Sequence, residues 1–536
     1  MDPTTAKLTL IAPEMVLCFG AVVVAVLGLM QNASLRRSVP LISALFLALS
    51  VVACTWSYST DAAESSGLLL PYLGSFAKPL IACIAILLVM IGGTAVDRRL
   101  EAAFDSGRVP FEAVRVLRGE FHAFMLLSVA GTMLIASATD LIWLFLALEL
   151  SSLPSYVMVA VGRHARKAQE AGVKYFFLGA MSSAVFLYGF ALLYGATGTL
   201  QCTEMAEVLS RQAAEGGIST LAIVGAVMAI LGVSFKLAAV PMHFYAPDVY
   251  EGASGPVTAF LGFGPKVAGI LALILLLSML GWSGHAAVLN GQEVKLQGLP
   301  APIAAMLWMM SVLTMTLGNI GALLQRNVKR MLGYSSIAHS GYLMMGLLAG
   351  PEAGLDAVLF YLVGYGVMNT VVLAVLCALE RNGEEVETLE DIAGLRHRQP
   401  LLAWTLALAA ASLVGLPPMI GFFGKIYLFT AVLEQGQTAL VIIAAVNSAV
   451  SVFYYMQLVV LPMLAQSNPR SETVTAVQSP WPKFAAVIGG VSIIALAIFA
   501  QPVFEAAQRA FRAPSVVAAS TDADASKVTH TITLDR

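Results

Sequence analysis

Charge is scarce in this sequence: Asp, Glu, Lys and Arg supply only 12% of its 536 residues, whereas hydrophobic residues supply 58%. About 25% of the residues in an ordinary soluble domain are charged. The mean hydropathy of +0.82 agrees with this bias. The composition therefore excludes a water-soluble globular protein and predicts a chain that crosses a membrane many times. A net charge of −2 without a basic stripe gives no sign of a nucleic-acid partner.

Paired cysteines are also missing. The sequence has five cysteines, and no two of them are spaced as CxxC. Four fall in or beside apolar segments, where cysteine behaves as a small hydrophobic residue. This pattern argues against an iron–sulfur cluster, a zinc site and a disulfide framework. The cysteines are Cys18, Cys54, Cys83, Cys202 and Cys377.

Nucleotide-binding motifs are absent as well. No GxGxxG opens a helix after a strand, and the string nearest to a phosphate-binding loop, from Gly421 to Ile426, lacks the hydroxyl residue. We therefore expect this chain to bind no nucleotide and to carry no cofactor or metal. The first 20 residues lack a basic region before a short apolar core with a cleavage site. They indicate a first membrane span rather than a removable signal peptide.

Long apolar segments fill most of the sequence. About 20 apolar residues cross a bilayer, and fourteen segments meet that length. The twelfth is long enough to be two half-helices. The segments cover residues 9–30, 39–58, 76–95, 120–136, 139–160, 172–195, 220–243, 255–280, 301–321, 328–349, 355–379, 400–432, 438–463 and 483–504.

Basic residues are unevenly divided between the two sets of loops. Of the 30 lysines and arginines, 18 fall in one set and eight in the other, which includes the tail. The richer set is expected to face the cytoplasm. An even number of spans then places both termini on the outer, periplasmic side of a bacterial inner membrane. The polar tail at residues 505–536 is expected to be disordered.

Two of the apolar segments contain prolines close to a lysine. One holds Lys236 and Pro241, and the other holds Pro417, Pro418 and Lys425. Proline removes a backbone hydrogen bond that lipid cannot replace, and a lysine in the bilayer costs roughly 2.5–3.5 kcal/mol or more. Interrupted helices in corresponding positions of two halves are the best sequence sign of an ion site in a repeat-built transporter.

These positions predict an all-α polytopic membrane protein with about fourteen transmembrane helices, two inverted five-helix repeats, and discontinuous seventh and twelfth helices. Five spans per repeat would place the two copies in opposite orientations. We divide the chain into an N-terminal three-helix segment, two repeats, a C-terminal helix and a polar tail. The boundaries are residues 1–119, 120–280, 281–464, 465–504 and 505–536.

Five ionisable residues stand out within the predicted spans: Glu149, Lys174, Lys236, Lys266 and Lys425. A single buried lysine could simply pair with a carboxylate and join two helices. One glutamate cannot balance four lysines, so some lysines must be neutral or face water. A lysine that changes its charge readily can carry a proton. Glu149 would then act as a switch. Close to Lys236, it would keep that lysine charged, and after moving away it would let the lysine lose its proton.

Two further features belong to the same group. Lys266 follows Gly262, Gly264 and Pro265, where we expect another helix irregularity. His339 lies in the middle of its span and can relay a proton through its two ring nitrogens. The other polar residues in the spans are expected to form ordinary interhelical hydrogen bonds.

Five strings in order along the chain resemble a known family. They cover about residues 5–505 and resemble the antiporter-like subunits of respiratory complex I, and more narrowly its N subunit. Two of the strings, ELSSLPSYV and HFYAPDVYEGA, favour the N subunit over its L and M sisters and over Mrp-type antiporter subunits. The five strings are LFLALELSSLPSYVMVA, KYFFLGAMSSAVFLYG, SFKLAAVPMHFYAPDVYEGA, KRMLGYSSIAHSGY and GLPPMIGFFGKIYLF.

The resemblance implies a proton-translocating module in the membrane arm of NADH:quinone oxidoreductase. Flavin, iron–sulfur clusters and quinone would lie in partner subunits, and the M, K and J subunits would be neighbours, with lipid around them. By motif match, Glu149 would be the key carboxylate and Lys236 its partner. Lys266 would lie on the central axis and Lys425 on the exit side. Lys174 would be a further lysine of the sixth span, and the role of His339 is implied less directly.

Two other functions fit parts of the pattern. A Mrp-like cation/proton antiporter subunit would share the lysines and the broken helices. An inert spacer between pumping modules would share the fold but would not need titratable groups inside it.

Overall fold

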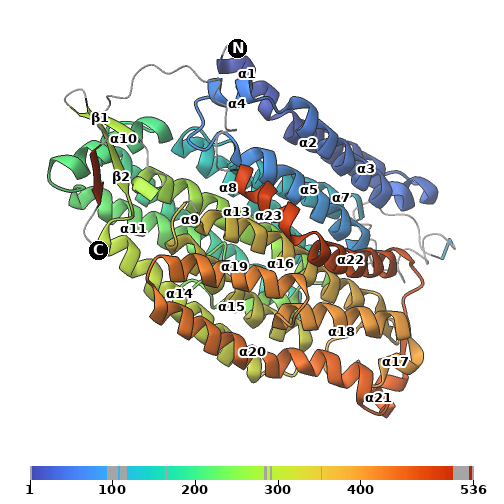
Figure 1. The fold of residues 1–536 in the computed structure, drawn as a ribbon. Helices are drawn as coiled ribbons and strands as arrows, with labels where there is room; N and C mark the ends of the chain where they lie inside the picture. Colours follow the sequence, from blue (N-terminus) through green and yellow to red (C-terminus); the bar gives the residue numbers. More distant parts are fainter. Residues whose placement is uncertain are drawn as a thin grey trace.

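The computed structural model describes residues 3–92, 107–108, 118–162, 166–282, 286–289, 292–351, 353–510 and 530–533. Long helices run side by side in one bundle (Figure 1). The N-terminal segment covers one side of it. Its helices are α1 (Pro3–Leu10), α2 (Ala12–Gly28), α3 (Ala33–Ser57), α4 (Thr60–Ser65) and α5 (Leu73–Gly92).

The next helices correspond to the first predicted repeat. Asp140 caps the second of them, because its carboxylate accepts a hydrogen bond from the backbone N–H of Trp143 at 2.8 Å. The helices are α7 (Arg118–Ile135), α8 (Leu141–Val161), α9 (Arg166–Thr197), α10 (Cys202–Glu215), α11 (Thr220–Ser234), α12 (Ala246–Gly252), α13 (Gly255–Leu277) and the short π-helix η2 (Ser278–Trp282).

The second predicted repeat and the C-terminal part follow. Asn327 caps α15 by accepting from the N–H of Arg330 at 3.0 Å. The helices are α14 (Ala301–Leu323), α15 (Val328–Leu348), α16 (Gly354–Cys377), α17 (Leu395–Arg398), α18 (Pro400–Val414), α19 (Ile420–Glu434), α20 (Thr438–Leu464), α21 (Pro469–Glu472), α22 (Trp481–Ile498) and α23 (Ala500–Arg509).

The described residues include six short strands, five of them between helices and one, β6, near the C-terminal end. One sheet has the order β1-β2-β6, and the other has the order β4-β3-β5, with both of its pairs antiparallel. The strands are β1 (Ala286–Leu289), β2 (Gln292–Gln297), β3 (Leu379–Arg381), β4 (Glu384–Glu385), β5 (Val474–Ala476) and β6 (His530–Thr533).

A helix lies in each of the fourteen predicted segments, so the mostly helical membrane architecture is confirmed. Within the described residues, nine helices are long and apolar enough to cross a membrane, or ten if α1 and α2, bent by 54°, are one span. Three further apolar helices, α7, α11 and α18, are shorter. The count of fourteen therefore stays a prediction.

The centre of the bundle is formed by α13 and α16, which contact each other and are buried along their whole length. Both are apolar on every side, as expected of helices surrounded by other helices. Around them the outer helices expose large apolar side chains, as a membrane-facing surface requires.

Both predicted interruptions are present. The first separates α11, which ends at Ser234, from α12, which begins at Ala246. The second separates α18 from α19, and Gly415 at the end of α18 has φ +88°, a left-handed conformation that favours glycine. The expected irregularity near Lys266 is wrong, because α13 continues through Gly262, Gly264 and Pro265.

The C-terminal expectation also needs correction in part. Residues 500–509 form α23, an amphipathic helix whose Phe504 ring lies 4.2 Å from that of Tyr427. Residues 530–533 form β6, which pairs with β2. A disordered tail is therefore not found at residues 505–509 or 530–533, and residues 511–529 lie outside the described part of the chain.

Candidate functional site

Lys236 lies in the first break and is buried, with 4% of its surface exposed. Its Nζ donates to Ser152 Oγ of α8 and lies 3.5 Å from the hydroxyl of Tyr156. The irregular backbone around it is satisfied by protein groups, since Tyr245 donates to the Phe235 carbonyl at 2.7 Å. Such irregular backbone persists at membrane depth only where protein or water surrounds it.

Glu149 occupies the middle of α8 and is half-buried. Its Oε1 accepts a hydrogen bond from Ser183 Oγ of α9 at 2.5 Å. Among the described residues it forms no ion pair with Lys236 within 4.0 Å. Ser152, which binds Lys236, follows Glu149 by three positions and so lies on the neighbouring turn of the same face. The two proposed partners are therefore adjacent but separate in this structure.

Lys266 is buried on α13, with 2% of its surface exposed. Its Nζ donates to the Ser336 carbonyl and, at 2.7 Å, to Ser340 Oγ, both on α15. It also lies 4.9 Å from the ring centre of Tyr365. Ser340 in turn donates to the carbonyl of Leu237, the residue after Lys236, at 2.5 Å. One serine thus links the first break to the central lysine.

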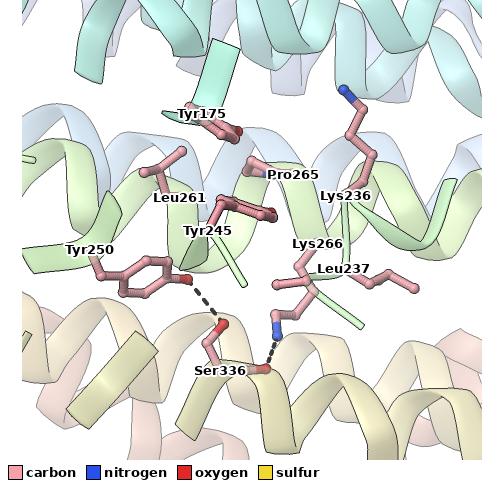
Figure 2. A pocket seen from close by; sticks show the side chains of 10 residues that line it. Tyr175, Lys236, Leu237, Tyr245, Tyr250, Leu261, Pro265, Lys266 and Ser336 are labelled. Carbon is pink, nitrogen blue, oxygen red and sulfur yellow. Dashed lines mark hydrogen bonds between the residues drawn. The ribbon is translucent and has the colours of Figure 1, made fainter. Parts of the chain in front are cut away.

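A small cavity of about 10 Å³ lies between Lys236 and Lys266. Figure 2 shows their amino groups pointing in opposite directions, while Tyr245 and Tyr250 lie between the helices. A single water needs about 10–15 Å³ measured in this way, so the cavity is at the lower limit for one. The two lysines therefore line opposite sides of one small cavity.

His339 is buried on α15 and uses both ring nitrogens. Nδ1 lies 2.6 Å from the hydroxyl of Tyr361, and Nε2 lies 2.8 Å from that of Tyr455. Its ring centre is 4.7 Å from that of Tyr365, the residue that also contacts Lys266. The histidine therefore continues the polar row beyond the central lysine.

Lys425 lies on α19, just after the second break, and is 6% exposed. Its Nζ donates to the carbonyls of Val414 at 2.7 Å and Leu413 at 3.3 Å, and to Ser448 Oγ at 2.9 Å. These carbonyls lack helical partners because α18 ends at Val414. A helix C-terminus favours positive charge, so the break itself supplies the site for the ammonium.

Lys174 does not belong to this buried row. Its side chain is 40% exposed and binds Asp248 at 2.6 Å and Glu170 at 2.7 Å. The first turns of α9 therefore hold it in a separate cluster of charges, at the end of the bundle predicted to face the cytoplasm.

The three lysines of the row share one property. Among the described residues, Lys236, Lys266 and Lys425 form no ion pair with a carboxylate within 4.0 Å, and their partners are hydroxyl and carbonyl oxygens. Those oxygens accept hydrogen bonds from either a charged or a neutral amine. The arrangement can therefore hold each lysine in both protonation states.

Sequence reasoning missed one buried ion pair. Lys78 on α5 lies 2.8 Å from Glu14 on α2, with exposed side-chain fractions of 6% and 2%, and also donates to the Leu10 carbonyl at 2.6 Å. Lys78 falls in the predicted span 76–95 but is not one of the five ionisable residues that stood out in the sequence. A lysine directly before Pro79 in an apolar run is the same signal that marked the two breaks, so it could have been recognised.

The tyrosines around His339 were also missed. Tyr361 and Tyr365 lie one helical turn apart on α16, and Tyr455 comes from α20. The sequence shows that Tyr361 and Tyr365 share one face of a helix, but it does not show that any of the three tyrosines lies close to His339.

The fold, its two interrupted helices and the row of three buried lysines define a class, the antiporter-like membrane proteins. The family model described as NADH:quinone oxidoreductase/Mrp antiporter, TM, matches residues 138–451. Among solved structures, a chain of respiratory complex I from Thermus thermophilus is similar, at 29% identity and a TM-score of 0.70, over 92% of this chain and 98% of that one. A Mrp complex from Dietzia, at 20% identity and a TM-score of 0.72, shares the fold.

Curated relatives narrow the class to one subunit. NADH-quinone oxidoreductase subunit N of Trichlorobacter lovleyi is 43% identical over 64% of this chain and 67% of its own. The subunit N of Rhodospirillum rubrum is 37% identical over 84% and 86%, and subunit N 1 of Rhizobium meliloti is 36% identical over 87% and 90%. This chain belongs to the NADH-quinone oxidoreductase subunit N family and is a multi-pass membrane protein.

Proposed function

We propose that this chain is a proton-translocating subunit in the membrane arm of NADH:quinone oxidoreductase. One observation carries the proposal: Lys236, Lys266 and Lys425 are buried along one polar row and bind only neutral oxygens. Lysines held in this way can gain and lose protons without breaking an ion pair. NADH-to-quinone electron transfer in other subunits would drive the movement of protons along the row.

Each residue of the row has a proposed role. Glu149 switches the proton affinity of Lys236 by moving towards or away from it. Lys266 joins the two halves through Ser340, and Lys425 is the outlet, with His339 between them. This chain would hold no redox centre, so flavin, iron–sulfur clusters and quinone would be bound by partner subunits.

The interrupted helices support the inverted repeat. If α11 with α12 and α18 with α19 are each taken as one broken span, five spans run from α7 to α13 and five from α14 to α20, and the fourth of each group is the broken one. We propose a pseudo-two-fold axis in the membrane plane between them, fourteen spans in all, and termini on the periplasmic side of a bacterial inner membrane.

The surface around Glu149 is the face of this chain where we expect other subunits to bind. Leu146 and Leu153 on α8, three residues before and four residues after Glu149, are exposed on the same face of the helix as this half-buried carboxylate. A carboxylate in an apolar face is costly against lipid alone. We propose that other membrane-arm subunits cover this face, with the M, K and J subunits as the expected neighbours and lipid on the rest.

A Mrp-like antiporter subunit remains the alternative function. The fold does not separate the two, because the similar Mrp and complex I structures have close TM-scores. The subunit N relatives favour the respiratory enzyme.

The proposal is tested with Glu149→Ala and Lys236→Ala in the assembled complex in proteoliposomes. We expect each to lower NADH-driven proton uptake by about tenfold or more, since a positioned proton-transfer group contributes 10²–10⁴-fold. Lys483→Ala is the matched control, because Lys483 is exposed. Normal proton uptake in both buried variants would reject the proposed function.

A further inference from the structure

The short helix α12 has only seven residues and follows directly after the break that contains Lys236. A helix of this length is not stable alone, so its position depends on its neighbours. It packs between α9 and α15, one from each predicted repeat. A Cβ added at Gly252 would lie 2.6 Å from the Lys167 carbonyl, and one at Gly333 would lie 3.1 Å from Pro247 Cα. At both positions α12 and its neighbours therefore pack too closely for a side chain larger than that of glycine.

Ion pairs join α12 to both neighbours. Asp248 binds Lys174 of α9 and Arg330 of α15, each at 2.6 Å. Glu251 binds Arg330 at 3.1 Å and Lys167 at 2.9 Å. Asp248 and Glu251 are 33% and 21% exposed, at the end predicted to be cytoplasmic.

The Asp248 carboxyl group is ionised at neutral pH. Burial alone would raise its pKa, but the hydrogen bonds and positive charges of Lys174 and Arg330 outweigh that effect and hold the pKa below its ordinary value. The ion pairs of α12 are therefore formed in the resting protein.

The residues flanking Asp248 face the proton row. Tyr250 donates to Ser336 Oγ at 3.0 Å, and the Ser336 carbonyl accepts from Lys266. Tyr245 and Tyr250 line the cavity between Lys236 and Lys266 (Figure 2). Asp248 follows Tyr245 by three residues, a rise of about 4.5 Å along a helix. The water-exposed ion pairs and the cavity wall thus belong to one short, rigid element.

We infer that Asp248 is a positioning residue of the proton path. Its ion pairs hold α12 in the position that closes the cytoplasmic side of the cavity between Lys236 and Lys266. Release of these pairs lets α12 move, and water then reaches the cavity from the cytoplasm. This inference rests on the proposed function, since it assigns the entrance of the same path.

The test measures access of water to the cavity and does not require turnover. Leu261 lines the cavity and is 6% exposed, so Leu261→Cys is introduced into a chain whose five native cysteines are alanine. The assembled complex in inside-out vesicles is treated with a charged methanethiosulfonate reagent. We expect Asp248→Asn to speed labelling by about tenfold or more, because the loss of one charge-assisted hydrogen bond shifts an opening equilibrium by that amount.

The controls separate this role from a general loss of structure. Asp248→Glu keeps the charge and should label as slowly as the parent. Glu170→Gln removes the other partner of Lys174 but leaves Asp248 paired, so it should also label slowly. Arg330→Gln removes the ion pair between Asp248 and Arg330 by changing the partner on α15. This variant should label fast even if Asp248→Asn does not assemble.

Equal labelling rates in the parent, Asp248→Asn and Arg330→Gln would overturn the inference. Fast labelling by Asp248→Glu would also overturn it, because the charge would then not be what holds α12. Labelling does not depend on proton pumping. Equal labelling rates would therefore reject the role of Asp248 without rejecting the proposed function, and normal proton uptake in the Glu149 and Lys236 variants would reject the proposed function without deciding the role of Asp248.

Discussion

At the residue scale, the buried lysines differ from ordinary buried charges in their partners. A carboxylate partner would fix the proton on the amine, because removing one charge of a buried pair costs about 3–5 kcal/mol. Serine hydroxyls and backbone carbonyls impose no such cost. Lys78, which is paired with Glu14, is the contrasting case within the same chain. We therefore assign Lys78 a structural role and the row of three a proton-carrying one.

Lys425 allows the titratable function to be separated from positive charge. We expect Lys425→Ala to lower proton uptake about tenfold or more, because nothing replaces the carrier. Lys425→Glu should be milder, since a protonated carboxyl can still donate to the Val414 carbonyl. Proton uptake in proteoliposomes measures both. Equal losses would mean that Lys425 acts through positive charge alone.

Lys78→Met leaves the Glu14 carboxylate buried without its partner. We expect a loss of about 3–5 kcal/mol in stability, seen as a lower thermal midpoint of the assembled complex. The double variant Glu14→Gln with Lys78→Met should recover most of this loss, because no unpaired charge remains. If the double variant is no more stable than Lys78→Met, the ion pair does not explain the effect.

At the element scale, the two broken helices place their lysines differently. Lys236 lies within the first break, where the chain has left the helix, whereas Lys425 follows the second break and binds the exposed end of α18. The order of lysine and proline in the sequence already indicated this difference. It explains why Lys425, but not Lys236, binds carbonyls released by a helix end.

The sequence was sufficient for the helices, for both breaks and for the burial of Lys236, Lys266 and Lys425, because apolar length and proline act locally. It was insufficient for the partners of these lysines. Ser152 and Lys236 are 84 residues apart in sequence, and Ser340 and Lys266 are 74 apart, so their contacts depend on how helices pack. Lys174 shows the same limit, since its position near a helix start did not reveal the pairing with Asp248.

At the scale of the whole molecule, the small sheet β4-β3-β5 ties the end of α16 to the segment before α22. Asp391 beside it is 1% exposed and binds Arg470 at 2.8 Å and Arg381 at 3.6 Å. Burial alone would raise its pKa, but hydrogen bonds from Thr388 and Arg470 hold the pKa below its ordinary value. This carboxylate therefore stabilises the connection only while it is charged.

The stabilisation from Asp391 should depend on pH in one direction. A depressed pKa in the folded state contributes stability above the unfolded value, near 3.9, and this is lost as the pH falls through the folded value. We expect Asp391→Asn to lower the thermal midpoint at pH 7 and to flatten its fall below about pH 4. An unchanged acid dependence in the variant would show that other groups control it.

Across the whole molecule, the row of lysines forms one path only if Lys266 connects the two halves. Proton uptake driven by NADH, measured in proteoliposomes for Lys266→Met and for the exposed control Lys483→Met, tests this most directly. We expect uptake to fall about tenfold or more in Lys266→Met and to stay at the parent level in the control. Parent-level uptake in Lys266→Met, in a fully assembled complex, would contradict a proton path through this chain's central lysine.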